Sequence, residues 1–224
     1  MKQFSIRIIF LIFLIPAFCI QGTAQDTLGK VRYSTEYRFY DGIYISFDQV
    51  IQNQPISRSR IISDINPSEI DYYSQLLRNE IITYVDLLGE QKQVPVKALW
   101  GYCNEGVLHI HWNNSFSRIP VVGNIAHFVS MVTVVHDPYM DPFYMSSPAM
   151  MPRSYETTDL QQYILDFKTG SVMVFNLESM EIVLSRDQKL YEEFLDIKKR
   201  KRKKLLFVYL RKYNERNPLY LPEN

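Results

Sequence analysis

An apolar–polar alternation with a period of two runs from Glu80 to Val135 and constrains the fold more than any other feature of this 224-residue chain. Short turns interrupt it, at Gly89-Glu90, Asn104-Glu105-Gly106 and Asn113-Asn114. A parallel return between strands needs a crossover of about a dozen residues, so strands joined by such turns must run antiparallel. The sequence therefore predicts an antiparallel β-meander with strands at Ile81–Val85, Val94–Tyr102, Val107–Trp112, Phe116–Val122 and Ile125–Val135.

Helix-start patterns precede the meander. Ser46 and Gln49 have the spacing of a capping box and predict a short helix that Pro55 ends. Asn66 followed by Pro67 has the residue preferences of a helix cap and a first helical position. We therefore expect two short helices on the N-terminal side of the sheet.

The chain after the meander predicts an irregular loop, a hairpin and two further helices. Residues 137–157 contain four prolines and no glycine, which favours an irregular loop rich in Pro, Met and Tyr. A hairpin is expected over residues 162–175. Asn176 then caps a short helix, and Asp187 caps a long helix that reaches about Asn214.

These elements predict the α+β fold class and a single domain over residues 25–224. In it, an antiparallel β-meander is bracketed by short N-terminal helices and a long C-terminal helix. A domain of this size buries enough of its surface to fold without disulfides. This agrees with the sparse cysteine content, since Cys103 is the single cysteine after residue 24.

The first 24 residues have the three parts of a secretory signal peptide. A positively charged start precedes an apolar, uncharged run over residues 8–20, and Gly22-Thr23-Ala24 offers small residues for cleavage after Ala24. The apolar run is shorter than the ~20 residues of a membrane-spanning helix. We therefore expect an exported protein, either periplasmic or secreted. Lipoprotein anchoring at Cys19 is the alternative, although Phe18 stands where a small residue is needed.

Four short motifs are spread over most of the chain that follows: Asp41-Gly42-Ile43-Tyr44-Ile45-Ser46-Phe47, Leu99-Trp100-Gly101-Tyr102-Cys103, Arg118-Ile119-Pro120-Val121-Val122-Gly123 and Leu210-Arg211-Lys212-Tyr213-Asn214. Through these motifs the sequence resembles a family of uncharacterised exported proteins of Gram-negative bacteria. The resemblance implies one intact domain over most of the exported chain. It implies no particular activity and transfers no functional residues, because none is established for the family.

The charge distribution separates an acidic body from a basic C-terminal part. Residues 25–186 carry 12 Lys and Arg against 18 Asp and Glu, whereas residues 187–216 carry 11 against 5. Seven consecutive cations, here called the basic segment, put charge on every face of a helix and cannot be packed on all sides. They are Lys198, Lys199, Arg200, Lys201, Arg202, Lys203 and Lys204. We predict an exposed anion-binding site here; the alternative is a solvated face beside the acidic body.

The partner of such a site depends on the compartment. Outside the cytoplasm the available polyanions are lipid phosphates, lipopolysaccharide and acidic glycans, so we expect one of these or another envelope protein, and no nucleic acid. Each cation near an anionic membrane surface contributes about 1 kcal/mol of attraction.

His109 and His111 are the sharpest candidates for a metal site. Residues i and i+2 of a strand share a face, so both imidazoles could bind one Zn²⁺ with a third ligand from a neighbouring strand. This gives the alternative function, a metal-dependent hydrolase. Against it, the apolar set of Leu108, Ile110 and Trp112 places both histidines on the opposite face, which we expect to be in solvent.

Two other groups have a chemical interpretation beside a structural one. Cys103 is expected to be a buried thiol, and a nucleophile only if His109 lies across the turn as a base. The methionines of the 137–157 loop either hold Cu(I) or contact a partner with soft side chains. They are Met140, Met145, Met150 and Met151.

No catalytic or cofactor motif stands out in the chain. It has no Gly-rich phosphate loop, no Gly-x-Ser-x-Gly and no His-Glu-x-x-His. We therefore expect no cofactor. The sequence favours a non-enzymatic exported protein that binds or organises a component of the cell envelope.

Overall fold

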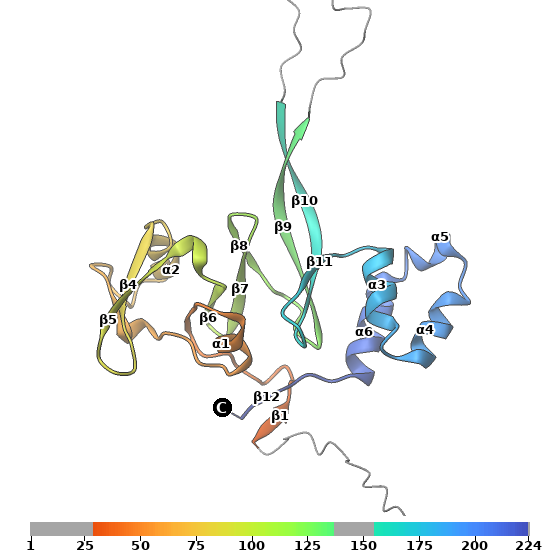
Figure 1. Ribbon diagram of the computed structural model, residues 1–224, viewed down its shortest axis with the longest axis horizontal. Helices are drawn as coiled ribbons and strands as arrows, with labels where there is room; N and C mark the ends of the chain where they lie inside the picture. The colour runs from red at the N-terminus through yellow and green to blue at the C-terminus, as the bar shows by residue number, and fades with distance from the viewer. Residues whose placement is uncertain (1–28, 137–154, 224) are drawn as a thin grey trace, which may run out of the picture.

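The computed structural model describes residues 29–136 and 155–223 (Figure 1). The expected signal peptide, Cys19 and the loop methionines lie outside these ranges. The strands are β1 (Lys30–Arg32), β2 (Gly42–Tyr44), β3 (Ile61–Ile62), β4 (Ile81–Val85), β5 (Gln91–Pro95), β6 (Gly101–Asn104), β7 (Val107–Trp112), β8 (Ser115–Arg118), β9 (Ile125–His136), β10 (Tyr155–Asp166), β11 (Val172–Val174) and β12 (Tyr220–Pro222). The helices are α1 (Phe47–Ile51), α2 (Tyr72–Leu76), α3 (Leu177–Leu184), α4 (Gln188–Leu195), α5 (Lys199–Arg202) and α6 (Leu206–Arg216), with 3-10 turns at Arg58–Arg60 and Val96–Ala98.

Within the described residues the strands form four antiparallel sheets, ordered β1-β12, β11-β10-β9, β2-β6-β7-β8 and β3-β4-β5. The antiparallel direction predicted from the short turns is confirmed. The single β-meander is wrong, because the chain changes sheet after β5 and again after β8. Pro95 and Pro120 stand at these two points, and proline cannot donate the N–H that would continue a ladder.

The predicted long C-terminal helix is also wrong, because it is divided into α4, α5 and α6. The ring centroids of Phe194 and Tyr209 lie 4.6 Å apart, whereas fifteen residues of straight helix would separate them by about 22 Å. Arg216 Nε, at the end of α6, donates to Asp187 Oδ2 at the start of α4, 2.6 Å away. The break therefore folds α6 back along α4, so that the buried sides of both helices pack on the eight residues of α3.

The local helix caps explain which helix starts were predictable. Ser46, Asn176 and Asp187 each accept a hydrogen bond from the backbone N–H three residues later, as predicted from their spacing. The second N-terminal helix is shorter than expected, since α2 begins at Tyr72. Asn66 instead accepts from the N–H of Ser68 and forms a turn.

β9 and β10 form a long two-stranded ribbon that projects from the middle of the molecule (Figure 1). They pair over all twelve residues, from Ile125 with Asp166 to His136 with Tyr155, so residues 155–157 are strand and not irregular loop. Alternate side chains of the ribbon point to its two opposite faces, and each face packs against a different part of the structure. Ile125 and Ile164 pack against the helices α3, α4 and α6, whereas Phe128 and Leu165 pack on the opposite side against the β2-β6-β7-β8 sheet.

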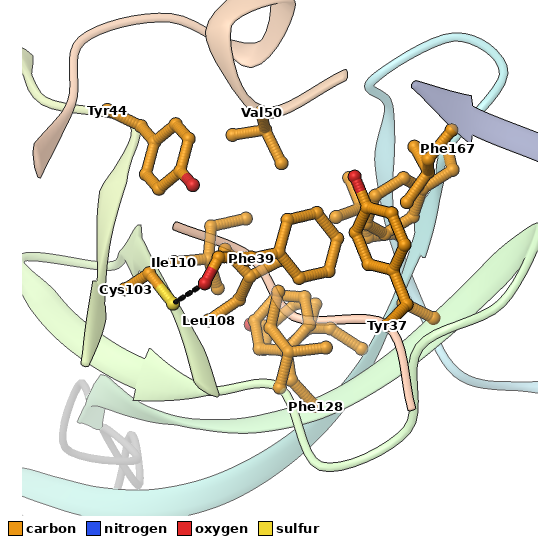
Figure 2. Packing of buried hydrophobic residues seen from close by; sticks show 14 residues of the cluster. Tyr37, Phe39, Tyr44, Val50, Cys103, Leu108, Ile110, Phe128 and Phe167 are labelled. Carbon is orange, nitrogen blue, oxygen red and sulfur yellow. Dashed lines mark hydrogen bonds between the residues drawn. The ribbon is translucent and has the colours of Figure 1, made fainter. Parts of the chain in front are cut away.

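The core on the sheet side is shown in Figure 2. Aromatic and aliphatic side chains from the N-terminal loop, from α1 and from several strands converge there. Cys103 is fully buried, as predicted, and its Sγ donates to the carbonyl oxygen of Phe39 at 3.5 Å. The labelled members are Tyr37, Phe39, Tyr44, Val50, Cys103, Leu108, Ile110, Phe128 and Phe167.

Two polar contacts join the helices α3 to α6, here called the helical layer, to the ribbon. The side-chain amide of Asn214 in α6 accepts from Ile125 N and donates to Ile125 O, both at 2.8 Å. Asp166 is fully buried and pairs with Arg186 at 2.7 Å. Burial favours the neutral form of Asp166, but the Arg186 guanidinium and the backbone N–H of Lys168 together hold the pKa of that carboxyl below its usual value.

None of the helices within residues 29–136 and 155–223 has the length and apolar character needed to span a bilayer.

Candidate functional site

The basic segment forms the most exposed part of the helical layer. Its central residues form the short helix α5, at the end of the layer on the side from which the ribbon projects (Figure 1). All of its side chains except Arg202 are exposed. Within the described part of the chain, these six cations have no ion pair and no side-chain hydrogen bond. They are Lys198, Lys199, Arg200, Lys201, Lys203 and Lys204.

Arg202 differs from its neighbours because its side chain is only 14% exposed. Its Nη1 donates to Glu181 Oε1 of α3 at 2.5 Å, and its guanidinium lies 5.6 Å from the ring centroid of Phe194 in α4. The side chain therefore fixes α5 to the two helices beneath it. Six of the seven predicted anion-binding residues are left free to meet a ligand.

A pocket of about 270 Å³ opens beside the end of the basic segment, where β10 and β11 meet the start of α6. Lys203 and Lys204 line it together with four apolar residues and two glutamines. These other residues are Leu160, Phe175, Leu206, Phe207, Gln161 and Gln162. The pocket therefore combines positive charge with an aromatic surface.

His127, on β9, packs against two residues that line this pocket. Its ring lies at an angle to Phe207 and Phe175, with centroid distances of 4.7 and 5.2 Å. Burial lowers the pKa of His127, so the imidazole is neutral at neutral pH. Its Nε2 lies 3.2 Å from Gln162 Oε1, which it binds as a donor. The amide nitrogen of Gln162 is thereby left available to a ligand oxygen.

The apolar surface of the pocket continues along one face of the ribbon. Leu160 pairs directly with Met131 across the strands, and Val129 follows at the next position of the same face. The three side chains are 76%, 57% and 39% exposed, respectively. This is a contiguous apolar strip that lies next to the cationic end of the basic segment.

His109 and His111 lie opposite the buried Leu108 and Ile110, as predicted, but the expectation that they are in solvent is wrong. His109 stacks on Tyr102 with centroids 4.4 Å apart, and His111 stacks on Phe116 at 4.7 Å. No three His, Cys, Asp or Glu side chains in the described residues come together as a metal-binding group. The third ligand required by the zinc hypothesis is therefore not found beside this pair.

His109 belongs to a column of stacked groups that joins the Arg58–Arg60 turn and α2 to the β2-β6-β7-β8 sheet. The Arg58 guanidinium lies 4.8 Å from the ring centroid of Tyr73, Tyr73 stacks on Tyr102, and Tyr102 stacks on His109. Burial lowers the pKa of His109, and its Nδ1 lies 3.1 Å from the carbonyl oxygen of Val107. These contacts give the imidazole a structural role.

Cys103 has the environment of an inert thiol. Burial raises its pKa, and the nearby Asp41 carboxylate raises it further. A thiolate is the nucleophilic form of cysteine, so both effects work against catalysis. The Cu(I) hypothesis falls on Met140, Met145, Met150 and Met151, which lie outside the described residues.

Sequence reasoning missed the apolar half of the pocket. Leu160, Gln162 and Phe175 are separated from Lys203 by 28 to 43 positions, so only the fold brings them together. One clue was present, since Leu160 stands between the polar residues Asp159 and Gln161. The apolar side chains near the other end of the strand, Tyr163, Ile164 and Leu165, are buried.

The chain matches no family model, no curated protein and no solved structure. The resemblance to exported proteins of Gram-negative bacteria therefore stays a prediction.

Replacing Arg202 with Gln should lower the free energy of unfolding by about 1–2 kcal/mol, because it leaves the half-buried Glu181 without its partner. Lys201→Gln is the matched control and should change stability by less than about 0.5 kcal/mol, since Lys201 is exposed and unpaired. Urea unfolding of the two variants measures the difference. Equal effects would contradict the structural role of Arg202.

The stability of the protein should fall as the pH drops through about 6.5, the ordinary histidine pKa. Burial lowers the pKa of His109 in the folded state, so below pH 6.5 the unfolded chain binds a proton more readily than the folded chain. Proton binding therefore stabilises the unfolded state and lowers the free energy of unfolding. His109→Phe keeps an aromatic ring on Tyr102 but cannot titrate. The free energy of unfolding of this variant should therefore fall less than that of the wild type when the pH is lowered from neutral to below the pKa of His109 in the folded protein. An unchanged decline would show that His109 is not the group involved.

Proposed function

We propose that this protein is exported and binds an anionic component of the cell envelope through its basic segment. The observation that carries the proposal is the set of six exposed cations between Lys198 and Lys204 that have no counter-ion within the described residues. Phosphate-bearing lipids and lipopolysaccharide have the matching chemistry, and acidic glycans are a further candidate. The proposal includes no catalytic step.

Electrostatics explains why an anion should bind here. Several like charges within about 10 Å of chain repel one another, and a polyanion relieves that repulsion. Among the contacts of the described residues, Arg202 is the one member of the segment with an acidic partner, Glu181. The other cations therefore keep their full charge for an external partner, with about 1 kcal/mol of attraction each near an anionic membrane.

The alternative function, a metal-dependent hydrolase that uses His109 and His111, gains no support from the geometry. Both rings are held in aromatic stacks, and one nitrogen of His109 is occupied by a backbone carbonyl. A hydrolytic zinc site needs three protein ligands around an open position.

Vesicle binding tests the proposal. The protein should co-sediment with phosphatidylcholine vesicles that contain phosphatidylglycerol, and binding should weaken as salt shortens the Debye length to about 8 Å at physiological strength. Gln at positions 198–201 should reduce binding at least tenfold, because it removes four unpaired cations and leaves Arg202 intact.

The matched control removes the same charge from exposed lysines elsewhere, at positions 30, 97, 168 and 189. It should retain most of the binding. If both variants lose binding equally, only the net charge matters and the segment is not a site. If the wild-type protein does not bind the anionic vesicles even at low salt, the basic segment is only a solvated surface and the proposal is wrong.

The export part of the proposal has its own test. Cleavage after Ala24 should leave Gln25 as the first residue of the protein recovered from the periplasmic or secreted fraction of its native host. Mass spectrometry of the intact protein measures this directly. A diacylglyceryl group on Cys19 would instead identify a lipoprotein.

A further inference from the structure

We infer that the pocket between β10, β11 and the start of α6 binds a single phosphate-bearing lipid. The phosphate lies against Lys203 and Lys204, and the first part of the acyl chain lies against Leu160 and Phe207. The inference rests on the proposed function and gives it a ligand class. It also separates two parts of the basic segment, since Lys198–Lys201 attract anions in general while Lys203 and Lys204 belong to a shaped site.

The head-group end of the site is defined by charge. Lys203 and Lys204 both line the pocket, and neither has an ion pair within the described residues. Gln162 adds an amide donor, because the neutral His127 occupies its oxygen. Two ammonium groups beside an amide donor suit a phosphate, which offers several acceptor oxygens and up to two negative charges.

The chain end of the site is defined by apolar surface. Phe175 and Phe207 contact each other at a centroid distance of 4.7 Å and form an aromatic wall. Leu160 lies at the rim and is 76% exposed, an unusual state for a leucine with two apolar neighbours on the same ribbon face. A chain that leaves the pocket over Leu160 continues along Met131 and Val129.

The size of the pocket fits part of a lipid. Pockets for small ligands usually enclose ~300–1,000 Å³, and this one encloses about 270 Å³. It therefore holds a phosphate and the first carbons of a chain, while the open apolar strip carries the rest. A bare phosphate would leave Phe207 and Leu160, which are 41% and 76% exposed, in contact with water.

The ribbon favours an individual lipid molecule over an intact bilayer. β10 runs five residues past Leu160 to Tyr155, which is about 17 Å of strand. A flat membrane that touched the end of the ribbon would stay that far from the pocket, so the vesicle binding proposed above requires a membrane that approaches Lys198–Lys201 from beside the ribbon. Insertion of this part into hydrocarbon is disfavoured, because it carries Glu156 and Asp159 and has open backbone edges.

Calorimetric titration of the full exported chain with two soluble probes tests the inference. Dihexanoyl phosphatidic acid, below its critical micelle concentration, presents phosphate and chain, whereas glycerol 3-phosphate presents the head group alone. The lipid should bind at least tenfold more tightly, because burial of two methylene groups already accounts for about that factor.

Two variants assign the contacts. Leu160→Gln should weaken lipid binding at least threefold and leave glycerol 3-phosphate binding unchanged. Leu87→Gln, at a residue 88% exposed in the turn between β4 and β5, should change neither. The double change Lys203→Gln and Lys204→Gln should weaken both probes at least tenfold. Its control is the double change Lys168→Gln and Lys189→Gln, which removes two exposed lysines elsewhere.

Each outcome separates the inference from the proposed function. Equal affinity for the two probes, or equal effects of the two leucine changes, overturns the lipid site. If the protein then still binds anionic vesicles in a salt-dependent way, the proposed function stands without it. If neither the probes nor the vesicles bind, both are overturned. Tighter binding of an acidic peptide than of the lipid would assign the pocket to a protein partner and also overturn the inference.

Discussion

The register of the β9–β10 ribbon is the constraint on which the rest of the structure depends. Side chains alternate between the two faces of a strand pair, so each face has its own set of residues. Ile125, His127 and Ile164 face the helices, and Phe128 and Leu165 face the β2-β6-β7-β8 sheet. A register slip of one residue would exchange the two sets of side chains, so that both the helices and the sheet would lose their buried contacts with the ribbon. Asn214 and Arg186 reinforce the register by binding Ile125 and Asp166, which pair with each other across the ribbon.

The helical layer follows from the same anchor. α3 has only eight residues on which to bury two amphipathic helices, and the cap at Asn176 starts it two residues after β11. A straight helix could place one of its two apolar stripes on α3 but not both. Folding back at residues 196–205 brings Phe194 against Tyr209 and Asp187 against Arg216, and it leaves the basic segment on the outside of the bend.

Local sequence patterns predicted what local contacts decide. The caps at Ser46, Asn176 and Asp187 were predictable because each hydrogen bond spans three residues. The antiparallel pairing was predictable because the turns are short. The division of the strands into several sheets, the break in the C-terminal helix and the apolar half of the pocket depend on contacts between distant residues. Phe194 with Tyr209 and Lys203 beside Leu160 are examples that no spacing rule contains.

The bend that breaks the helix also leaves the basic segment exposed for the binding that we propose. A continuous helix would have set these cations three and four residues apart along its surface, with repulsion between like charges at each step. The bend turns one of them, Arg202, inward to Glu181 and Phe194 and fixes the position of the remainder. The remaining repulsion weakens the fold unless an anion offsets it. Lys203 and Lys204 line the same pocket as Phe207, which is why the lipid that we propose carries both a phosphate and an apolar chain.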